Sequence, residues 1–519
     1  MRPAGPRRTK GFVLLLVVLL ALGAIGILLV THLNIGAAQA ARNRATDETL
    51  KIAADALVAY AAGRDFSSGT QKPGTLPCPD LNDDGVAENN CGNGTGSTQQ
   101  QNRLGRLPWK TLGLPDLRDA NGERLWYAVS SQFKTSTAAT VLATRQPLGL
   151  GTITLSNSAA TLIHDGTKDD PYLGDPGGAV ALVIAPGDVL VRQGSTVAQD
   201  RTCNGGSCSP AGDPTGTCTS LPPQLTAKCN PLNYLDIALG EDNADFVDVN
   251  GNAAARAGNG NGFIQGPVTV IVAGERVLAV NDRVLAITQD RIMAAVQRRI
   301  AGETMSCLRL YASLNRQRYP WPAPVCRQTP TNSNFWSDHD SVSFGRIPYD
   351  SSTLSFDTTA TYSMADTWGT STSFECNIAN NPSWWGDWKF QVFYAVADAY
   401  KPAATGNGGP CTTASSCLQV QDAAGTIIST GKQVAVIVAG RPLNTTTPVQ
   451  VRGGDNDGYA SNYLENSNKA LEGLINSTPP CGSLSPPPVS TACSPLSSCN
   501  KVTSSTLQSG FNDVVVYYP

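Results

Sequence analysis

The sequence predicts an α+β fold, in which a long N-terminal membrane-spanning helix precedes two tandem modules, each a helix plus a mainly antiparallel β-sheet. Three observations predict it: an uncharged apolar run near the N-terminus, a set of short phrases that occurs twice in the same order, and a composition rich in turn-forming residues. Gly and Pro number 50 and 34, which is typical of β-proteins with many loops rather than of helical bundles.

The N-terminal helix is predicted from charge and hydropathy. Basic residues precede an uncharged apolar run of nineteen residues at 12–30, and a helix of that length, at about 1.5 Å per residue, covers the roughly 30 Å hydrocarbon layer of a bilayer. Positive charge before the run predicts a cytoplasmic N-terminus and an external remainder. Two alternatives remain open, a signal peptide cleaved after Ala38-Gln39-Ala40 and a plain uncleaved anchor.

The helix is predicted to continue beyond the apolar run. No Pro or Gly interrupts residues 37–62, and Leu50, Ala53, Leu57 and Ala61 recur at helical spacing. Gly63 is a natural C-terminal stop. One long helix, apolar in its first half and amphipathic in its second, is therefore expected.

The start of this helix resembles the leader of a type IV prepilin. Lys10-Gly11-Phe12 stands where that family has its processing site. The resemblance implies that prepilin peptidase removes a basic leader peptide of residues 1–11, and that the helix then packs among other pilin-like subunits. Leu16 occupies the fifth mature position, where most pilins have glutamate, so the chain is most similar to minor subunits such as the K-type pseudopilin or minor pilins of the X type.

The remaining chain contains five phrases twice in the same order. LGRLPW at 104–109 returns as FGRIPY at 344–349, WYAV at 126–129 as FYAV at 393–396, VALVIA at 180–185 as VAVIVA at 434–439, NYLD at 233–236 as NYLE at 462–465, and NDRVL at 281–285 as NDVVV at 512–516. A second amphipathic helix is expected over 289–300. We therefore predict a transmembrane helix half at 12–36, a first module at 37–288 and a duplicated module at 289–519.

Both modules resemble pseudopilin heads. Asn121-Gly122 before an apolar segment predicts a hairpin, and Asp119 and Tyr127 fit the Asp, Trp-Gly and Tyr signature that such heads carry in their first hairpin. The phrases LPCPD, GRLPW and NYLE are also similar to those of uncharacterised proteobacterial prepilin-like proteins. The resemblance implies two pilin-like modules.

The cysteines indicate an oxidising compartment. All fourteen fall in local groups within loop-like sequence, which suits disulfides in a periplasmic or extracellular head. Cys78 with Cys91 and Cys307 with Cys326 are pairs whose short loops close at low entropic cost, and we expect both to form. The other pairings are not readable from the sequence.

An acidic loop is a candidate calcium site. Asp80, Asn82 and Asp84 alternate before a glycine, as oxygen ligands do in calcium loops, and Glu88 is a further candidate ligand. The alternative is a polar turn closed by the neighbouring disulfide. Calcium is the one cofactor that the sequence suggests.

Composition and motifs point to a structural role. Charged residues make up 15% and the net charge is −3, so no broad basic surface for nucleic acid is expected. The three histidines lack the motif companions that nucleophilic catalysis needs, and no enzyme is predicted. We predict a minor pilin or pseudopilin-like subunit of a type IV pilus or type II secretion system, at the filament tip.

The expected location is the inner membrane, single-pass, with a cytoplasmic N-terminus and a head in the periplasm or on a cell-surface filament. The expected partners are the membrane, prepilin peptidase and other pilin-like subunits. Two alternatives from other classes stay open. One is a single-pass membrane-anchored periplasmic binding protein or adhesin that joins no filament, and the other is a secreted polysaccharide hydrolase.

Overall fold

The structure is a computed structural model, and it describes a set of segments separated by gaps. The described residues are 10–64, 73–89, 91, 103–130, 133–134, 151–166, 177–195, 198–201, 230–244, 262–323, 325, 343–348, 388–403, 406–411, 416–443, 450–453, 457–465, 468, 501–504 and 511–519. Within α1, side chains are described for Val18 and from Gly36 onward.

The N-terminal helix α1 spans Lys10–Gly63 without interruption. Across the residues that the structure describes, no helix combines the length and the apolar character needed to cross a membrane. This finding overturns three predictions: the membrane-spanning helix at 12–36, its assignment as a pilin-type membrane segment, and the single-pass inner-membrane location. The charged residues Arg42, Arg44, Asp47 and Glu48 belong to the same helix. They lie C-terminal to the predicted span, in a part of α1 that is unsuited to hydrocarbon.

The first module contains a four-stranded antiparallel sheet. Its strands are β1 (Leu104–Arg106), β2 (Trp126–Val129), β5 (Ala181–Ala185) and β11 (Arg283–Ile287), in the order β1-β2-β5-β11. Strand β11 leads through Thr288 into the second long helix, α3 (Gln289–Leu314). The expected helix over 289–300 is thus longer than its apolar pattern indicated.

The second module repeats this sheet. Its strands are β12 (Phe344–Arg346), β13 (Val392–Val396), β16 (Val434–Val438) and β18 (Val514–Tyr518), in the order β12-β13-β16-β18. The register also repeats, since Gly105 lies opposite Tyr127 and Gly345 lies opposite Tyr394. Four of the five doubled phrases therefore occupy equivalent positions in two sheets of the same topology. The boundary between modules at 288 and 289 stays a prediction.

Smaller sheets complete each module, so the expectation of one main antiparallel sheet per module is corrected. One has the order β4-β3-β8 and its counterpart β15-β14-β17, and each combines an antiparallel pair with a parallel pair. The strands are β3 (Leu155–Ser156), β4 (Leu162–His164), β8 (Phe263–Ile264), β14 (Leu418–Gln421), β15 (Ile427–Lys432) and β17 (Lys501–Thr503).

The first module has two further hairpins in its described part. They are formed by β6 (Ile237–Ala238) with β7 (Glu241–Asp242), and by β9 (Val268–Val272) with β10 (Glu275–Val280). Short 3-10 helices occur at η2 (Pro231–Asn233), η5 (Asp398–Tyr400) and η7 (Ala460–Asn462). The parallel pairs β3 with β8 and β14 with β17 join segments far apart in the chain, so the alternation of local residues did not predict them. The two hairpins are local, and the sequence analysis did not single them out.

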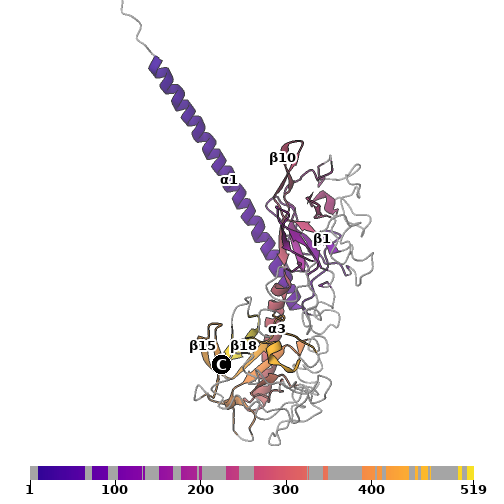
Figure 1. Cartoon of the computed structure of the whole chain (residues 1–519), viewed down its shortest axis with the longest axis vertical. Helices are drawn as coiled ribbons and strands as arrows, with labels where there is room; N and C mark the ends of the chain where they lie inside the picture. Colours follow the sequence, from indigo (N-terminus) through magenta and orange to yellow (C-terminus); the bar gives the residue numbers. More distant parts are fainter. Residues whose placement is uncertain are drawn as a thin grey trace, which may run out of the picture.

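The two faces of the first sheet are buried against different partners. Tyr127 and Val183 lie in the core shared with α1 and α3, whereas Trp126 and Ile184 lie in a second core with Tyr234. The C-terminal half of α1 contacts β5, β11 and α3, and α3 contacts β16 and β18. The sheets of each module, with the segments packed on them, are here called a head. The N-terminal part of α1 extends well beyond both heads (Figure 1).

Candidate functional site

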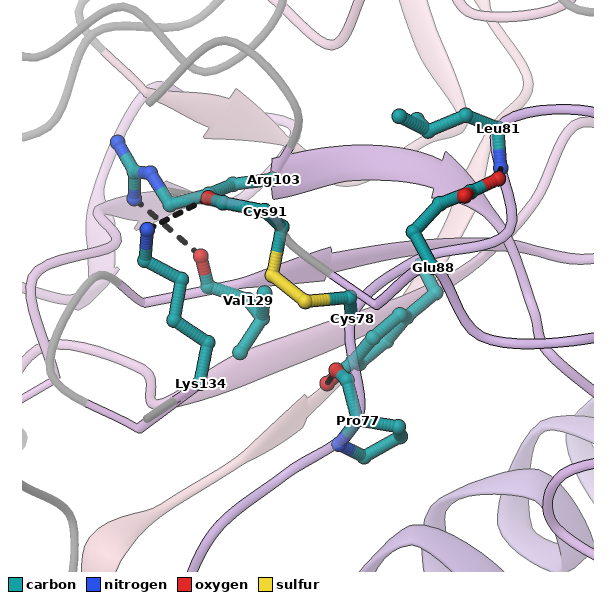
Figure 2. Close-up of a disulfide and its surroundings, with 9 residues drawn as sticks. Pro77, Cys78, Leu81, Glu88, Cys91, Arg103, Val129 and Lys134 are labelled. Carbon is teal, nitrogen blue, oxygen red and sulfur yellow. Dashed lines mark hydrogen bonds between the residues drawn. A yellow bond between two sulfur atoms is a disulfide. The ribbon is translucent and has the colours of Figure 1, made fainter. Parts of the chain in front are cut away.

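A disulfide fixes the start of the acidic loop. Cys78 and Cys91 are bonded, with their Cα atoms 5.6 Å apart. Both side chains are buried, and Lys134 Nζ donates to the Cys91 carbonyl oxygen over 2.6 Å (Figure 2). Tyr127 Oη donates to the Pro77 carbonyl oxygen over 3.1 Å. The disulfide therefore lies in the module core and holds both ends of the loop.

The other candidate disulfide is described in part. Cys307 is disulfide-bonded, and its expected partner Cys326 lies outside the described residues. A bond between Cys411 and Cys417, with Cα atoms 5.6 Å apart, is also present. These two cysteines are six positions apart, which is closer than in either pair that the sequence analysis singled out. The sequence did not predict this bond, because Cys376 belongs to the same group and three pairings were possible.

Backbone N–H groups occupy the side-chain oxygens of the acidic loop. Asp80 Oδ1 accepts from Asn82 N over 3.1 Å and Oδ2 accepts from Gly85 N over 2.7 Å. Asn82 Oδ1 accepts from Asp84 N over 3.0 Å, and Asp84 Oδ1 accepts from Val86 N over 2.7 Å. Each acceptor thus organises the turn, which is how Asp and Asn side chains stabilise loops.

Gly85 closes the loop because no larger residue fits there. Its φ is +84°, and an added Cβ would lie 2.6 Å from Nε1 of the Trp109 ring. Glu88 folds back toward the loop, where its Oε1 accepts from Leu81 N over 3.4 Å (Figure 2). The four candidate ligands therefore lie in one turn, with their oxygens directed at backbone donors.

Burial sets the charge state of this loop. It raises the pKa of Asp80 to about 6, against the opposing effect of the Gly85 hydrogen bond, and it also raises the pKa of Glu88. Arg124 pairs with the intervening Asp83 over 2.8 Å. Among the described residues, no group of three or more His, Cys, Asp or Glu side chains is arranged to hold a metal ion, so calcium binding stays a prediction.

The residues of the expected processing site lie at the start of α1. The helix begins at Lys10 and includes Gly11 and Phe12, whose side chains are outside the described set. Residues 36–42, here termed the exposed segment of α1, have exposed side chains, and Thr46 is the first buried residue after them. This exposed segment lies between the head and the apolar run of the sequence.

Two buried acid pairs were missed at the level of sequence. Asp236 and Asp282 lie together in the first module, and Glu465 and Asp513 occupy the equivalent place in the second. The available signal was that both doubled phrases NYLD/NYLE and NDRVL/NDVVV contain an acid. Their meeting could not be read from the sequence, because each pair joins residues more than forty positions apart.

No family model matches the chain, and no curated protein or solved structure is significantly similar to it. The functional argument therefore depends on the geometry of this chain alone.

Proposed function

We propose that the chain is a non-enzymatic structural subunit that assembles with other subunits through the N-terminal part of α1 and presents two heads. The observation that carries the proposal is the continuity of α1, because one helix is anchored in the head core at one end and extends beyond the heads at the other (Figure 1). Any subunit that binds the N-terminal part of α1 is therefore connected to the heads through one continuous helix.

The anchored half of α1 is held by a buried apolar face. Leu50, Ala53, Leu57 and Ala61 are at most 3% exposed. Ion pairs from Asp47 and Asp55 to arginines of β11 and α3 flank this face. These contacts hold the C-terminal half of α1 in a fixed orientation on the first module. Because the helix is continuous, they also determine the direction of its N-terminal part.

The projecting part of α1 needs a partner. Residues 10–42 form about 50 Å of helix at 1.5 Å per residue, and an isolated helix is marginal in water without tertiary packing. The sequence of residues 12–30 carries no charged side chain, and a helix that is apolar all round is normally covered. Helices of other subunits supply such a cover, as they do in pilin-like filaments.

Two heads on one helix favour a rare position in such an assembly. A doubled head is wider than a single one and would crowd its neighbours along a filament shaft, whereas the tip has room. Leu16 also lacks the carboxylate with which most pilins pair the N-terminal amine of a neighbour. A minor, tip-located subunit accommodates both features.

Site-specific photo-crosslinking in cells that make the whole assembly tests the proposal. A photoreactive residue at Ala38, in the exposed segment of α1, is expected to give adducts with other subunits, and the matched control at Ala424, in the exposed turn between β14 and β15, is expected to give few. Equal, background-level adducts at both positions would contradict the proposal, and that is the result expected of a separate binding protein or adhesin.

A further inference from the structure

Each module contains a fully buried pair of acids at the base of its last strand. The side chains of Asp236, Asp282, Glu465 and Asp513 are between 0% and 3% exposed. Asp282 directly precedes β11 and Asp513 directly precedes β18, while Asp236 and Glu465 follow η2 and η7. Burying one carboxylate is costly, and burying two together is more so, so the way these pairs are satisfied requires explanation.

In the first module, three of the four carboxyl oxygens have donors. Asp236 Oδ1 accepts from Gln199 Nε2 over 3.0 Å, and its Oδ2 accepts from Asn281 N over 2.8 Å. Asp282 Oδ2 accepts twice, from Asp236 N over 2.8 Å and from Asn243 Nδ2 over 2.7 Å.

The second module reproduces this pattern bond for bond. Glu465 Oε1 accepts from Gln450 Nε2 over 2.9 Å, and its Oε2 accepts from Asn512 N over 3.1 Å. Asp513 Oδ2 accepts from Glu465 N over 3.2 Å and from Asn468 Nδ2 over 3.0 Å. The arrangement persists although a longer glutamate replaces Asp236, so it is a property of the module and not of one loop.

One oxygen of each pair has no donor among the residues that the structure describes. These atoms are Asp282 Oδ1 and Asp513 Oδ1, which are buried, and leaving such an atom unsatisfied is expensive. In each module the backbone N–H of one acid donates to the carboxyl group of the other, which places the two acids side by side. Two carboxyl groups can bond to each other only when one of them carries a proton. A proton on the orphaned oxygen would convert it from an unsatisfied acceptor into a donor.

We propose that each module holds one shared proton in its acid pair, carried by Oδ1 of Asp282 or Asp513 and donated to the carboxylate of Asp236 or Glu465. The resulting hydrogen bond links the start of β11 to the segment after η2 in the first module, and the start of β18 to the segment after η7 in the second. Its loss at high pH leaves two neighbouring buried carboxylates, which repel each other and weaken the attachment of the last strand. The heads are therefore stabilised by a proton that solvent pH controls.

The arginines near the first pair cannot neutralise both of its acids. Arg201 acts on both acids, but its described hydrogen bonds go to backbone carbonyls and to Gln199. Arg192 also acts on Asp236 but is paired with Asp242, at 2.7 Å. Arg201 also lies 3.5 Å from the half-buried Glu123, so one arginine at most faces two carboxyl groups.

The second pair also has two carboxyl groups facing a single arginine. The buried Arg452 faces Glu465 and Asp513, while its described hydrogen bonds go to three backbone carbonyls and to Gln450. The nearby charges pair elsewhere: Asp457 accepts from Tyr463 Oη and has Arg346 beside it, and Arg441 is paired with Asp290. One arginine again faces two carboxyl groups, and one proton makes the cluster neutral.

The direction of the acid pKa values agrees with this geometry. Burial, followed by the charge of the partner acid, holds the pKa of Asp282 and of Asp513 well above the ordinary range. Burial raises the pKa of Asp236 to about 6 and also raises that of Glu465. Raised folded-state pKa values mean that this stabilisation is complete below the unfolded pKa of about 4 and is lost as pH rises through the folded values.

Asparagine substitutions distinguish the acid that carries the proton, Asp282 or Asp513, from the acid that accepts its hydrogen bond. In D282N the amide oxygen can accept both donors that Asp282 Oδ2 now accepts, and the amide nitrogen takes the place of the protonated Oδ1. D513N is equivalent in the second module. D236N is the matched control: both oxygens of Asp236 accept from donors, so an amide nitrogen at either place meets an N–H group and destabilises the module at every pH.

The test is denaturant unfolding of the full chain between about pH 5 and pH 8, for the wild type, D236N and the double variant D282N/D513N. Each retained proton makes the unfolding constant rise about tenfold per pH unit. The double variant is expected to lose this contribution of both modules and to exceed the wild type in stability at the alkaline end. An unchanged pH slope in the double variant, or a loss equal to that of D236N at all pH values, would overturn the proposal.

Infrared spectroscopy of the native wild type gives a readout that does not depend on a variant folding. A carbonyl band of protonated carboxylic acid is expected at neutral pH, and the D282N/D513N spectrum should lack it. If the wild type shows no protonated carboxyl group at neutral pH, the shared proton does not exist.

Discussion

The attachment of α1 to the first head should depend on burial far more than on charge. Leu57 is 0% exposed in the core that α1 shares with the sheet and α3. Truncation of a fully buried leucine to alanine removes its transfer free energy and leaves a cavity, so L57A is expected to lower the free energy of unfolding by about 2–5 kcal/mol.

The ion pairs beside it offer a matched comparison on the same helix. The Asp55 side chain is 58% exposed and that of its partner Arg291 is 31% exposed, and pairs of this kind contribute roughly 0.2–1 kcal/mol because water and salt screen them. D55A should therefore cost less than 1 kcal/mol. Denaturant unfolding of both variants at the same salt concentration measures the difference. A D55A loss equal to that of L57A would refute the argument that burial holds α1.

Three further predictions concern the core, the acidic loop and the leader. Y127F and Y394F should each cost about 1–3 kcal/mol, because each removes the hydroxyl that donates to a buried proline carbonyl; equal melting curves for variants and wild type would contradict this. Millimolar calcium is predicted to raise the melting temperature of the wild type and not that of D84A, and an absence of any shift in the wild type would end the calcium proposal. N-terminal sequencing of the mature protein is predicted to begin at Phe12, whereas a first residue near Ala41 would identify a cleaved signal peptide instead.

Local patterns predicted the repeated strands, for a physical reason. Four of the five doubled phrases include strand residues in both copies, while NYLD and NYLE begin in the 3-10 helices η2 and η7. In both copies an arginine follows Gly105 or Gly345 at the end of the strand. Arg106 lies over the ring of Trp126, with 4.3 Å to its centroid, and Arg346 lies over that of Phe393 at 4.9 Å. The GR phrase therefore recurs because its arginine covers an aromatic residue of the next strand.

Features that depend on distant parts of the chain were not predictable in this way. Two such features are the acid pairs and the parallel pairing of β3 with β8, which join segments with long sequence separation. The division of each module into separate sheets also depends on which distant strands pair. The membrane-spanning helix was wrong for another reason. Hydropathy of a run predicts burial of that run but does not specify what buries it, and the structure supports a long helix without supporting a membrane span.

The contact between the two helices joins the heads into one unit with α1. Arg299, on α3, donates to the carbonyl oxygens of Ala62 and Arg64 over 2.6 and 2.9 Å, where the unsatisfied carbonyls at the end of α1 favour a cation. On the same helix, Gln297 Nε2 donates to the carbonyls of Val438 and Asn512 in the second module. Since α3 is thus bonded to the end of α1 and to the second sheet, a force or attachment at the N-terminal part of α1 reaches both heads. This linkage is consistent with the proposed subunit, which carries two heads on one helix.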